Sequence, residues 1–416
     1  MQIVLLDETR FDTFASNHPN RNFYQSVNYG KMMNKHGHNA YYLGLVNDSN
    51  EIKAATLLIV KNDKNDRRKM GYAPRGFLID WNDFELVKEF SENLKTFLLK
   101  RSFTYIKVDP PVIYKQYDYN GNEKIESENN LNFVSRMQSL GYIHLGYNDN
   151  LETIKPRWNA ITSLNENIIS LYNSIKKEAR NKITLASNQG IKVYKGSIND
   201  INILYGMIEN KNISLDYFYD YYEFYNQNNN FEIYFAKLEP VTFVNSSKSL
   251  YEKEERKNQE LNEMIQSFST LNKENLINEK MESDNLIAKY KKDMQDAINF
   301  FQKYPNGIII GGAAILKYGD TVTFISSEIN KEFTQYFPNY LLKWHLFQEF
   351  AKQGYKTIDF KGIIKDYISK SNYLENAELS NKIVEYVGEF DLVINKKSYY
   401  TGNRLTPILN WLNTPI

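Results

Sequence analysis

A charged segment from Ser246 to Gln302 constrains the fold of this chain more than any other feature. Its apolar residues recur every three or four positions, at Leu261, Met264, Phe268 and Leu271 and again at Ile287, Tyr290, Met294, Ile298 and Phe301. This spacing puts one narrow apolar stripe on each of two helices, as in a coiled-coil seam. A solvated linker is the alternative, but a linker need not keep the spacing. We therefore predict two long helices folded back on each other as an arm.

The sequence on both sides of this arm alternates between strand-like and helical stretches. Strand-like runs include Tyr41 to Val46, Ala54 to Val60 and Tyr105 to Val108 before the arm, and Gly307 to Leu316 and Thr321 to Ser326 after it. Such alternation is typical of an α/β or α+β protein. A sheet that resumes after a helical hairpin implies that the arm is an insertion whose two ends lie close together.

The length of 416 residues allows two or three domains, at about 100 to 200 residues each. We predict a first domain at residues 1–155 and a second formed by residues 156–245 and 304–382. The arm occupies residues 246–303, and residues 383–416 form a strand and a helix that pack back on the body. The two halves have a similar order of elements, which indicates duplication of one fold.

Composition excludes several classes of function. The 51 basic and 50 acidic residues balance, so any contact with nucleic acid must be local. The absence of cysteine excludes disulfides, thiolate metal sites and cysteine nucleophiles. No signal peptide is evident and no apolar run approaches the roughly 18 residues of a membrane span, so we expect a cytoplasmic protein.

Common ligand motifs are missing or weak. The pair Gly311-Gly312 lacks the Lys-Ser/Thr of a phosphate-binding loop and is better explained by close packing in a strand. His36 and His38 have no carboxylate partner at ligand spacing, and we predict no metal site.

Charged residues next to apolar strands are the candidates for a site. They are Arg75, Asp109, Arg157 and Asp359. A charge at the end of a strand commonly faces the ligand crevice, although capping or ion pairing is the commoner fate of each residue alone. A local basic patch on a predicted helix, Lys176, Lys177, Arg180 and Lys182, is either a phosphate-binding surface or a solvated helix face.

A series of short motifs follows the chain. In order, they are YAPRGFLID at 72–80, VDPPV at 108–112, SLGY at 139–142, KPRW at 155–158, ARNK at 179–182, the helical insertion, YFPNYLLKW at 336–344, TIDFKG at 357–362 and EYVGEF at 385–390. Together these motifs resemble those of the Fem-type (FemABX) aminoacyltransferases of peptidoglycan bridge synthesis. The resemblance covers nearly the whole chain, and the order of the motifs makes it more specific than any one of them.

The resemblance implies two acetyltransferase-like (GNAT) domains of α/β (α+β) class with an inserted antiparallel coiled-coil arm. Family members transfer an amino acid from aminoacyl-tRNA to an amine of a lipid-linked or nucleotide-linked peptidoglycan precursor, at the inner membrane face. No cofactor is implied, because the ester already carries the activation, and the acetyl-CoA pyrophosphate loop is absent. A homodimer, or a heterodimer with another Fem-type protein, is a further implied partnership.

The resemblance also assigns residues. Asp109 and Tyr221 match family positions that contact the precursor. Arg75 and Arg157 match recurrent arginines that shape the cleft. Arg180 matches a recurrent arginine for which we expect contacts with substrate or phosphate. The arm and the basic patch are the candidate tRNA contacts. The segment 248–303 contains ten basic and eleven acidic residues, which favours the patch over the arm.

Three departures from the family pattern stand out. A precursor-binding lysine is replaced by Met33, with Lys31 and Lys35 nearby as candidate substrate contacts, and an arginine is replaced by Tyr217. The family also has a reaction-centre lysine in the segment that here runs from Tyr373 to Lys382, where no lysine precedes Lys382. Lys361, Lys365 and Lys370, together with Asp359, are the remaining catalytic candidates.

Two functions therefore compete. The first is an aminoacyltransferase, and the second is a non-catalytic Fem-like protein that binds precursor or a partner transferase and modulates the bridge. A lysine amine in the cleft near Asp109 and Asp359 would favour the first. A generic acetyltransferase, the third alternative, would bind acetyl-CoA.

Overall fold

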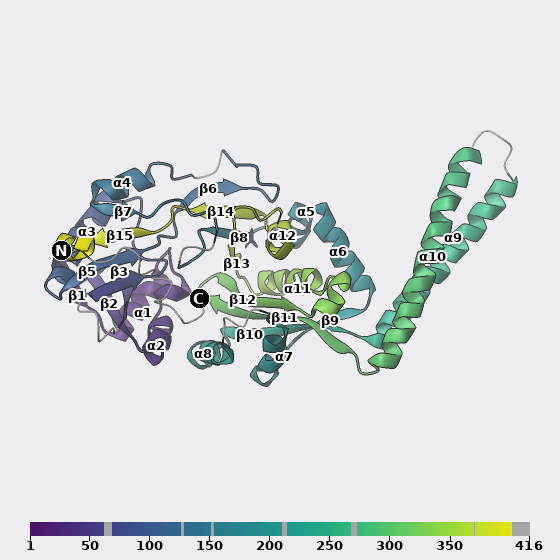
Figure 1. The fold of residues 1–416 in the computed structure, drawn as a ribbon, viewed down its shortest axis with the longest axis horizontal. Coiled ribbons are helices and arrows are strands. Elements are labelled where there is room, and N and C mark those ends of the chain that lie inside the picture. Colours follow the sequence, from purple (N-terminus) through teal and green to yellow (C-terminus); the bar gives the residue numbers. More distant parts are fainter. Residues whose placement is uncertain are drawn as a thin grey trace.

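The computed structural model describes residues 1–61, 69–125, 129–150, 154–209, 214–267, 273–369 and 371–401. Within these residues the chain forms two mixed sheets side by side, and a two-helix arm projects from the far end of the second sheet (Figure 1). No helix in the described ranges has both the length and the apolar character that crossing a membrane requires.

The first sheet contains most strands of the N-terminal part. In spatial order they are β1 (Gln2–Leu5), β2 (His38–Val46), β3 (Ile52–Lys61), β4 (Lys69–Ala73), β5 (Phe103–Val108), β15 (Phe390–Val393) and β7 (Tyr142–His144). Strands β4 and β5 are parallel, and their neighbours pair antiparallel. The helices of this part are α1 (Glu8–Asn17), α2 (Val27–Lys35), α3 (Phe84–Leu99) and α4 (Phe133–Ser139).

The second sheet follows the order β6 (Ile113–Tyr117), β14 (Lys382–Tyr386), β8 (Trp158–Ser163), β13 (Thr357–Ile363), β12 (Thr321–Ile329), β11 (Ile308–Tyr318), β10 (Phe231–Leu238) and β9 (Ile191–Lys195). Its parallel pair is β12 and β13. The helices of this part are α5 (Ile168–Ser174), α6 (Lys177–Asn188), α7 (Ile201–Met207), α8 (Leu215–Tyr225), α11 (Pro338–Lys352) and α12 (Ser371–Leu379), whereas α13 (Lys396–Thr401) packs against β5 of the first sheet.

Local sequence explains where several helices begin. Asp7, Asp83 and Ser214 each accept a hydrogen bond from a backbone N–H in the first turn of α1, α3 and α8. Helices α5 and α6 are separate, because Ile175 between them has an extended backbone. Its neighbour Lys176 donates its backbone N–H to Glu378 of α12 instead.

The two sheets exchange strands. Strand β6 leaves the N-terminal part and pairs with β14 in the second sheet, while β15 enters the first sheet between β5 and β7. The one strand predicted within residues 383–416 is therefore two strands in different sheets, β14 and β15, divided around Gly388, whose φ of 93° favours glycine. The proposed limits of the domains stay a prediction.

The hydrophobic core continues across both parts. One cluster joins Phe11, Tyr29 and Leu57 of the N-terminal part to Phe218 and Phe235 of the second part. Helix α2 packs against α8 at this junction. The two sheets therefore share buried apolar surface, the largest favourable term in folding, and are held together by it.

The arm consists of α9 (Pro240–Ser267) and α10 (Lys273–Lys303), packed along each other as predicted (Figure 1). The predicted stripe is only partly correct, since Leu261 is buried whereas Met264 and Phe301 are exposed. Phe268 and Leu271 lie outside the described residues. The seam also buries Asn258, whose amide Nδ2 donates to Asp284 at 2.8 Å.

Candidate active site

Two of the predicted site residues meet where adjacent parallel strands end. Ala73 of β4 lies opposite Val108 of β5, so Arg75 and Asp109 follow neighbouring carboxyl ends. The backbone N–H of Arg75 donates to Asp109 Oδ1 at 2.7 Å, and its guanidinium lies 3.6 Å from Oδ2. Arg75 also donates to the carbonyl of Pro156 at 2.7 Å and lies over the Tyr386 ring. These contacts fix a buried ion pair at the end of the first sheet.

A bulge in the second sheet places Asp359 and Lys361. The register of β13 with β8 shifts between Asp359 and Gly362, and Lys361 has a φ of 62°. Bulges bend a strand and redirect a side chain. The Lys361 N–H donates to Asp359 Oδ1 at 2.7 Å, and Asn159 donates to the same carboxylate at 3.2 Å. The strand approaches Pro156 so closely that a side chain at Gly362 would collide with it.

Burial shifts the pKa values of both groups. It raises the pKa of Asp359 above the usual range, against the opposing hydrogen bond from the Lys361 backbone. It lowers the pKa of the Lys361 amine from 10.5 to about 8, although Asp359 acts in the opposite direction. Both shifts follow from desolvation, which disfavours the charged form. An amine whose pKa lies nearer to neutral pH than usual, as that of Lys361 does, is suited to proton transfer.

Lys155 is the third charged group of this region, and its side chain is almost completely buried. Its Nζ lies 3.9 Å from the centre of the Tyr24 ring. Burial lowers the pKa of Lys155 well below 10.5, and the neighbouring Lys361 lowers it further. The backbone beside it is fixed, because Ile154 N–H donates to Glu389 at 2.7 Å.

These groups surround one cavity of about 290 Å³ between the two sheets. Its lining includes Arg21, Tyr24, Arg75, Lys155, Asn159, Thr323, Asp359, Lys361 and Tyr386. A cavity with a few convergent polar groups and perturbed pKa values is the expected form of a small active site. We therefore treat it as the candidate active site.

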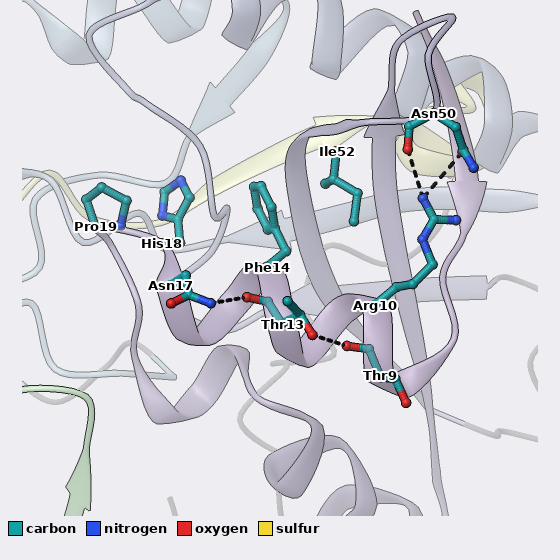
Figure 2. A pocket seen from close by; sticks show the side chains of 9 residues that line it. All are labelled: Thr9, Arg10, Thr13, Phe14, Asn17, His18, Pro19, Asn50 and Ile52. Atoms are coloured by element: carbon teal, nitrogen blue, oxygen red, sulfur yellow. Dashed lines mark hydrogen bonds between the residues drawn. The ribbon is translucent and has the colours of Figure 1, made fainter.

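A larger hollow of about 640 Å³ lies along α1 and has a different character (Figure 2). Its lining, which includes Arg10, Phe14 and Ile52, contains no carboxylate or lysine among the described residues. Arg10 donates to the backbone and side chain of Asn50, and Asn17 donates to the Thr13 carbonyl (Figure 2). It therefore offers no pair of groups for proton transfer.

The other predicted precursor contacts lie away from the cavity lining. Tyr221 is fully buried, and its hydroxyl is 3.0 Å from that of Tyr217. Lys31 pairs with Glu8 at 2.8 Å, and Lys35 pairs with Asp220 at 2.7 Å. Met33, at the departure from the family pattern, is buried in the shared core. The predicted contacts of Tyr221, Lys31 and Lys35 with substrate stay predictions.

Arg157 and Lys365 form ion pairs outside the cavity lining. Arg157 binds Glu385 Oε1 at 2.5 Å and donates to the carbonyl of Asn148 at 2.8 Å. Lys365 pairs with Asp149 at 3.1 Å. Lys370 lies outside the described residues. Of the two candidate lysines that the structure describes, Lys361 lines the cavity and Lys365 does not.

Two lysines of the basic patch form ion pairs with an acidic residue of the same chain. Glu378 of α12 binds Lys182 at 2.9 Å and Lys176 at 3.4 Å, and it accepts a hydrogen bond from Tyr340. Arg180 lies against Tyr172, and Lys177 is exposed. These contacts lower the positive charge that the patch presents, and its role in binding tRNA stays a prediction.

Sequence reasoning missed Lys155 as a site residue. The signal was present, because Lys155 begins the KPRW motif from which only Arg157 was selected. In the structure Lys155 lines the cavity, whereas Arg157 forms an ion pair with Glu385.

Comparison with known proteins agrees with this architecture. The model of the FemAB family matches residues 6–406. The chain belongs to the FemAB family. A lipid II:glycine glycyltransferase of Staphylococcus epidermidis is 23% identical over 98% of this chain and 97% of its own length. Proteins of the same name from Staphylococcus haemolyticus and Staphylococcus aureus are each 24% identical, with the same coverage.

The fold also agrees with a solved structure. The crystal structure of FemX superposes with a TM-score of 0.71 at 20% identity, over 96% of this chain and 99% of that one. The prediction of a mixed α/β fold with a helical hairpin arm in the FemAB family is thereby confirmed.

Proposed function

We propose that this protein is an aminoacyltransferase that adds an amino acid to an amine of a peptidoglycan precursor. The donor is aminoacyl-tRNA, and the acceptor is a precursor carried on a lipid or nucleotide at the cytoplasmic face of the membrane. Support comes from the whole-length match to the FemAB family and to relatives named for glycine transfer to lipid II.

The observation that carries the proposal is the presence of Asp359 and Lys361 in the lining of one cavity. The acceptor amine must lose a proton to attack the ester carbonyl, and Asp359 is the lining carboxylate that can accept it. Lys361 can donate to the carbonyl oxygen as that oxygen becomes negative. The C–O bond to the ribose then breaks, and the proton passes to the leaving hydroxyl.

The presence of Lys361 in the cavity also helps to choose between an enzyme and the non-catalytic alternative. The family's reaction-centre lysine segment is absent, and Glu375 in that segment pairs with the buried Lys343 instead. Lys361 supplies an amine from a neighbouring strand, next to Asp359. This arrangement favours an enzyme that uses a different lysine over a protein that only binds precursor.

The first prediction tests this assignment. Purified protein, a panel of charged tRNAs and lipid-linked precursor should give a branched product, measured by mass spectrometry. Asp359→Asn and Lys361→Met should each lower the rate by about 10² to 10³, the cost of losing a group at a developing charge. Lys365→Met should keep the wild-type rate, since its amine binds Asp149. Bound precursor without product from any charged tRNA would support the non-catalytic alternative instead.

A further inference from the structure

Another hollow adjoins the candidate active site. It measures about 770 Å³ and is lined by residues of α4, of β6 and of the loop before α3. Pro111 lines both this hollow and the cavity. The volume lies within the range of about 300 to 1,000 Å³ that is usual for sites of small ligands. We call it the Trp81 hollow, and its described lining includes Trp81, Pro111, Asn129, Phe133 and Arg136.

Two buried polar atoms of the Trp81 hollow have no hydrogen-bond partner among the described residues. They are Nε1 of Trp81, a donor, and Oδ1 of Asn129, an acceptor. Trp81 is only 7% exposed, and a buried indole N–H usually has a partner. A buried donor or acceptor that stays unpaired lowers stability. The two atoms require one acceptor and one donor, and a peptide group has both.

Arg136 adds a positive charge to the same lining. Its guanidinium lies over the Phe84 ring, with Cζ 4.6 Å from the ring centre, and within the described part of the chain it has no carboxylate partner. The Asp80 carboxylate, which also lines the hollow, accepts a hydrogen bond from the backbone N–H of Asn82 at 2.9 Å. An arginine forms strong, charge-assisted hydrogen bonds with a carboxylate. Arg136 is therefore suited to bind a carboxylate of a ligand.

The surroundings of Trp81 indicate which ligand fits. Phe77 stacks on the Trp81 ring at 5.7 Å between ring centres, and Phe133 contacts it edge-on at 5.6 Å. With 7% of Trp81 exposed, the ring faces are covered by the protein. A sugar that binds by stacking requires an open ring face, whereas a peptide carbonyl requires only the N–H. These contacts favour a peptide over a sugar.

We propose that the Trp81 hollow binds a peptide that carries a carboxylate. A backbone carbonyl of the peptide accepts from Trp81 Nε1, a backbone N–H donates to Asn129 Oδ1, and the carboxylate binds Arg136. Because Pro111 lines both spaces, a peptide in the hollow lies next to the group that reacts in the cavity. The peptide is then a part of the acceptor, and in this respect the inference rests on the proposed function.

A purely structural role is the alternative. Arg136 lies in the last turn of α4, where a positive charge interacts favourably with the end of the helix. Its contact with the Phe84 ring also contributes to stability. In that case a peptide would leave the indole N–H of Trp81 unaffected. A binding measurement that needs no catalytic activity therefore separates the two roles.

The second prediction uses NMR of the indole N–H groups of the four tryptophans, labelled with ¹⁵N in the full chain. Trp81→Phe assigns the Trp81 signal by its loss. The probe N-acetyl-Ala-Glu-Ala-amide should move the Trp81 indole proton to lower field, because the N–H gains an acceptor. Trp158 is the internal control and should not move, since its Nε1 also lacks a partner among the described residues but lies outside the lining.

The charge of the peptide provides the second part of the test. N-acetyl-Ala-Gln-Ala-amide, which lacks the carboxylate, should bind at least about tenfold more weakly than the acidic peptide. Arg136→Gln should weaken binding of the acidic peptide by about the same factor and leave binding of the neutral peptide unchanged. Arg101→Gln is the matched control and should keep the wild-type affinity, because Arg101 lies over the Phe97 ring but outside the hollow.

Four results overturn the proposal. They are an unmoved Trp81 signal at millimolar acidic peptide, equal affinity for the two peptides, wild-type affinity in Arg136→Gln, and a shift of Trp81 with N-acetylglucosamine in place of the peptide. Peptide binding without any transfer would refute the proposed function alone. Transfer without peptide binding would refute this proposal alone.

Discussion

At the scale of single residues, the cavity depends on charges that the fold removes from water. Asp359 and Lys361 lie two positions apart, and the bulge in β13 brings both to one cavity. Sequence reasoning found both residues but could not choose among Lys361, Lys365 and Lys370. It also overlooked Lys155, because burial depends on segments such as Tyr24 that are remote in the chain.

The third prediction concerns the pH dependence of stability. The pKa of Lys361 falls from 10.5 to about 8 on folding, so between these values the unfolded chain binds more protons than the folded chain. Stability must then rise with pH in that window. Relative to Lys361→Met, the wild-type free energy of unfolding should increase by about 1 to 2 kcal/mol between pH 8 and 10.

Urea unfolding followed by circular dichroism at several pH values measures this difference. Lys53→Met provides the matched control, because Lys53 is an exposed partner of Glu51. Parallel pH profiles for the wild type and Lys361→Met would contradict a lowered pKa at Lys361.

At the scale of elements, α12 carries two acidic residues that anchor neighbouring parts of the fold. Glu375 binds the buried Lys343, and Glu378 binds Lys176 and Lys182. Helix α12 therefore connects α11 to α6 through ion pairs. Lys176 and Lys182 of the basic patch take part in these ion pairs. The basic patch that the sequence suggests as a phosphate-binding surface is therefore partly neutralised by Glu378, about 200 positions further along the chain.

The fourth prediction tests this anchor. Burial alone raises the pKa of Glu378, but hydrogen bonds from Lys182 and Tyr340 hold it below its usual value. Glu378→Gln should lower the free energy of unfolding by about 1 to 3 kcal/mol, because it weakens charge-assisted bonds in a buried place. Chemical unfolding measures the effect.

The matched control for this anchor is Glu252→Gln on the arm. Glu252 faces Lys248 on the exposed side of α9, at 3.7 Å. An exposed pair of this kind contributes little, so the variant should remain within about 0.5 kcal/mol of the wild type. Equal stability of the two variants would show that Glu378 is not an anchor.

At the scale of the whole molecule, the exchange of β6 and β15 makes the two sheets interdependent. Strand β15 comes from the end of the described chain, yet it lies between β5 and β7. The Lys107 amine on β5 lies 3.3 Å from Glu389 and 3.2 Å from Asp391, around the start of β15. The cavity lies at the junction that these exchanged strands stabilise.

The fifth prediction follows from this exchange. A fragment of residues 1–155 lacks β15, so β7 loses its neighbour and β6 loses its partner β14. It should show no cooperative thermal transition and little protection of backbone amides in hydrogen exchange, whereas the full chain should show both. A cooperative transition in the fragment would mean that the first 155 residues form an independent domain.

The sequence by itself determined the family, the mixed α/β class, the helical arm and the motifs that contain the site. These properties follow from local periodicity and motif order, which short stretches of chain carry. Only the tertiary structure decided that Lys361 and Lys155 share a cavity, that Arg157 pairs with Glu385, and that β14 and β15 belong to different sheets. Those outcomes depend on burial and on strand pairing between segments remote in sequence, and neither is encoded in local pattern.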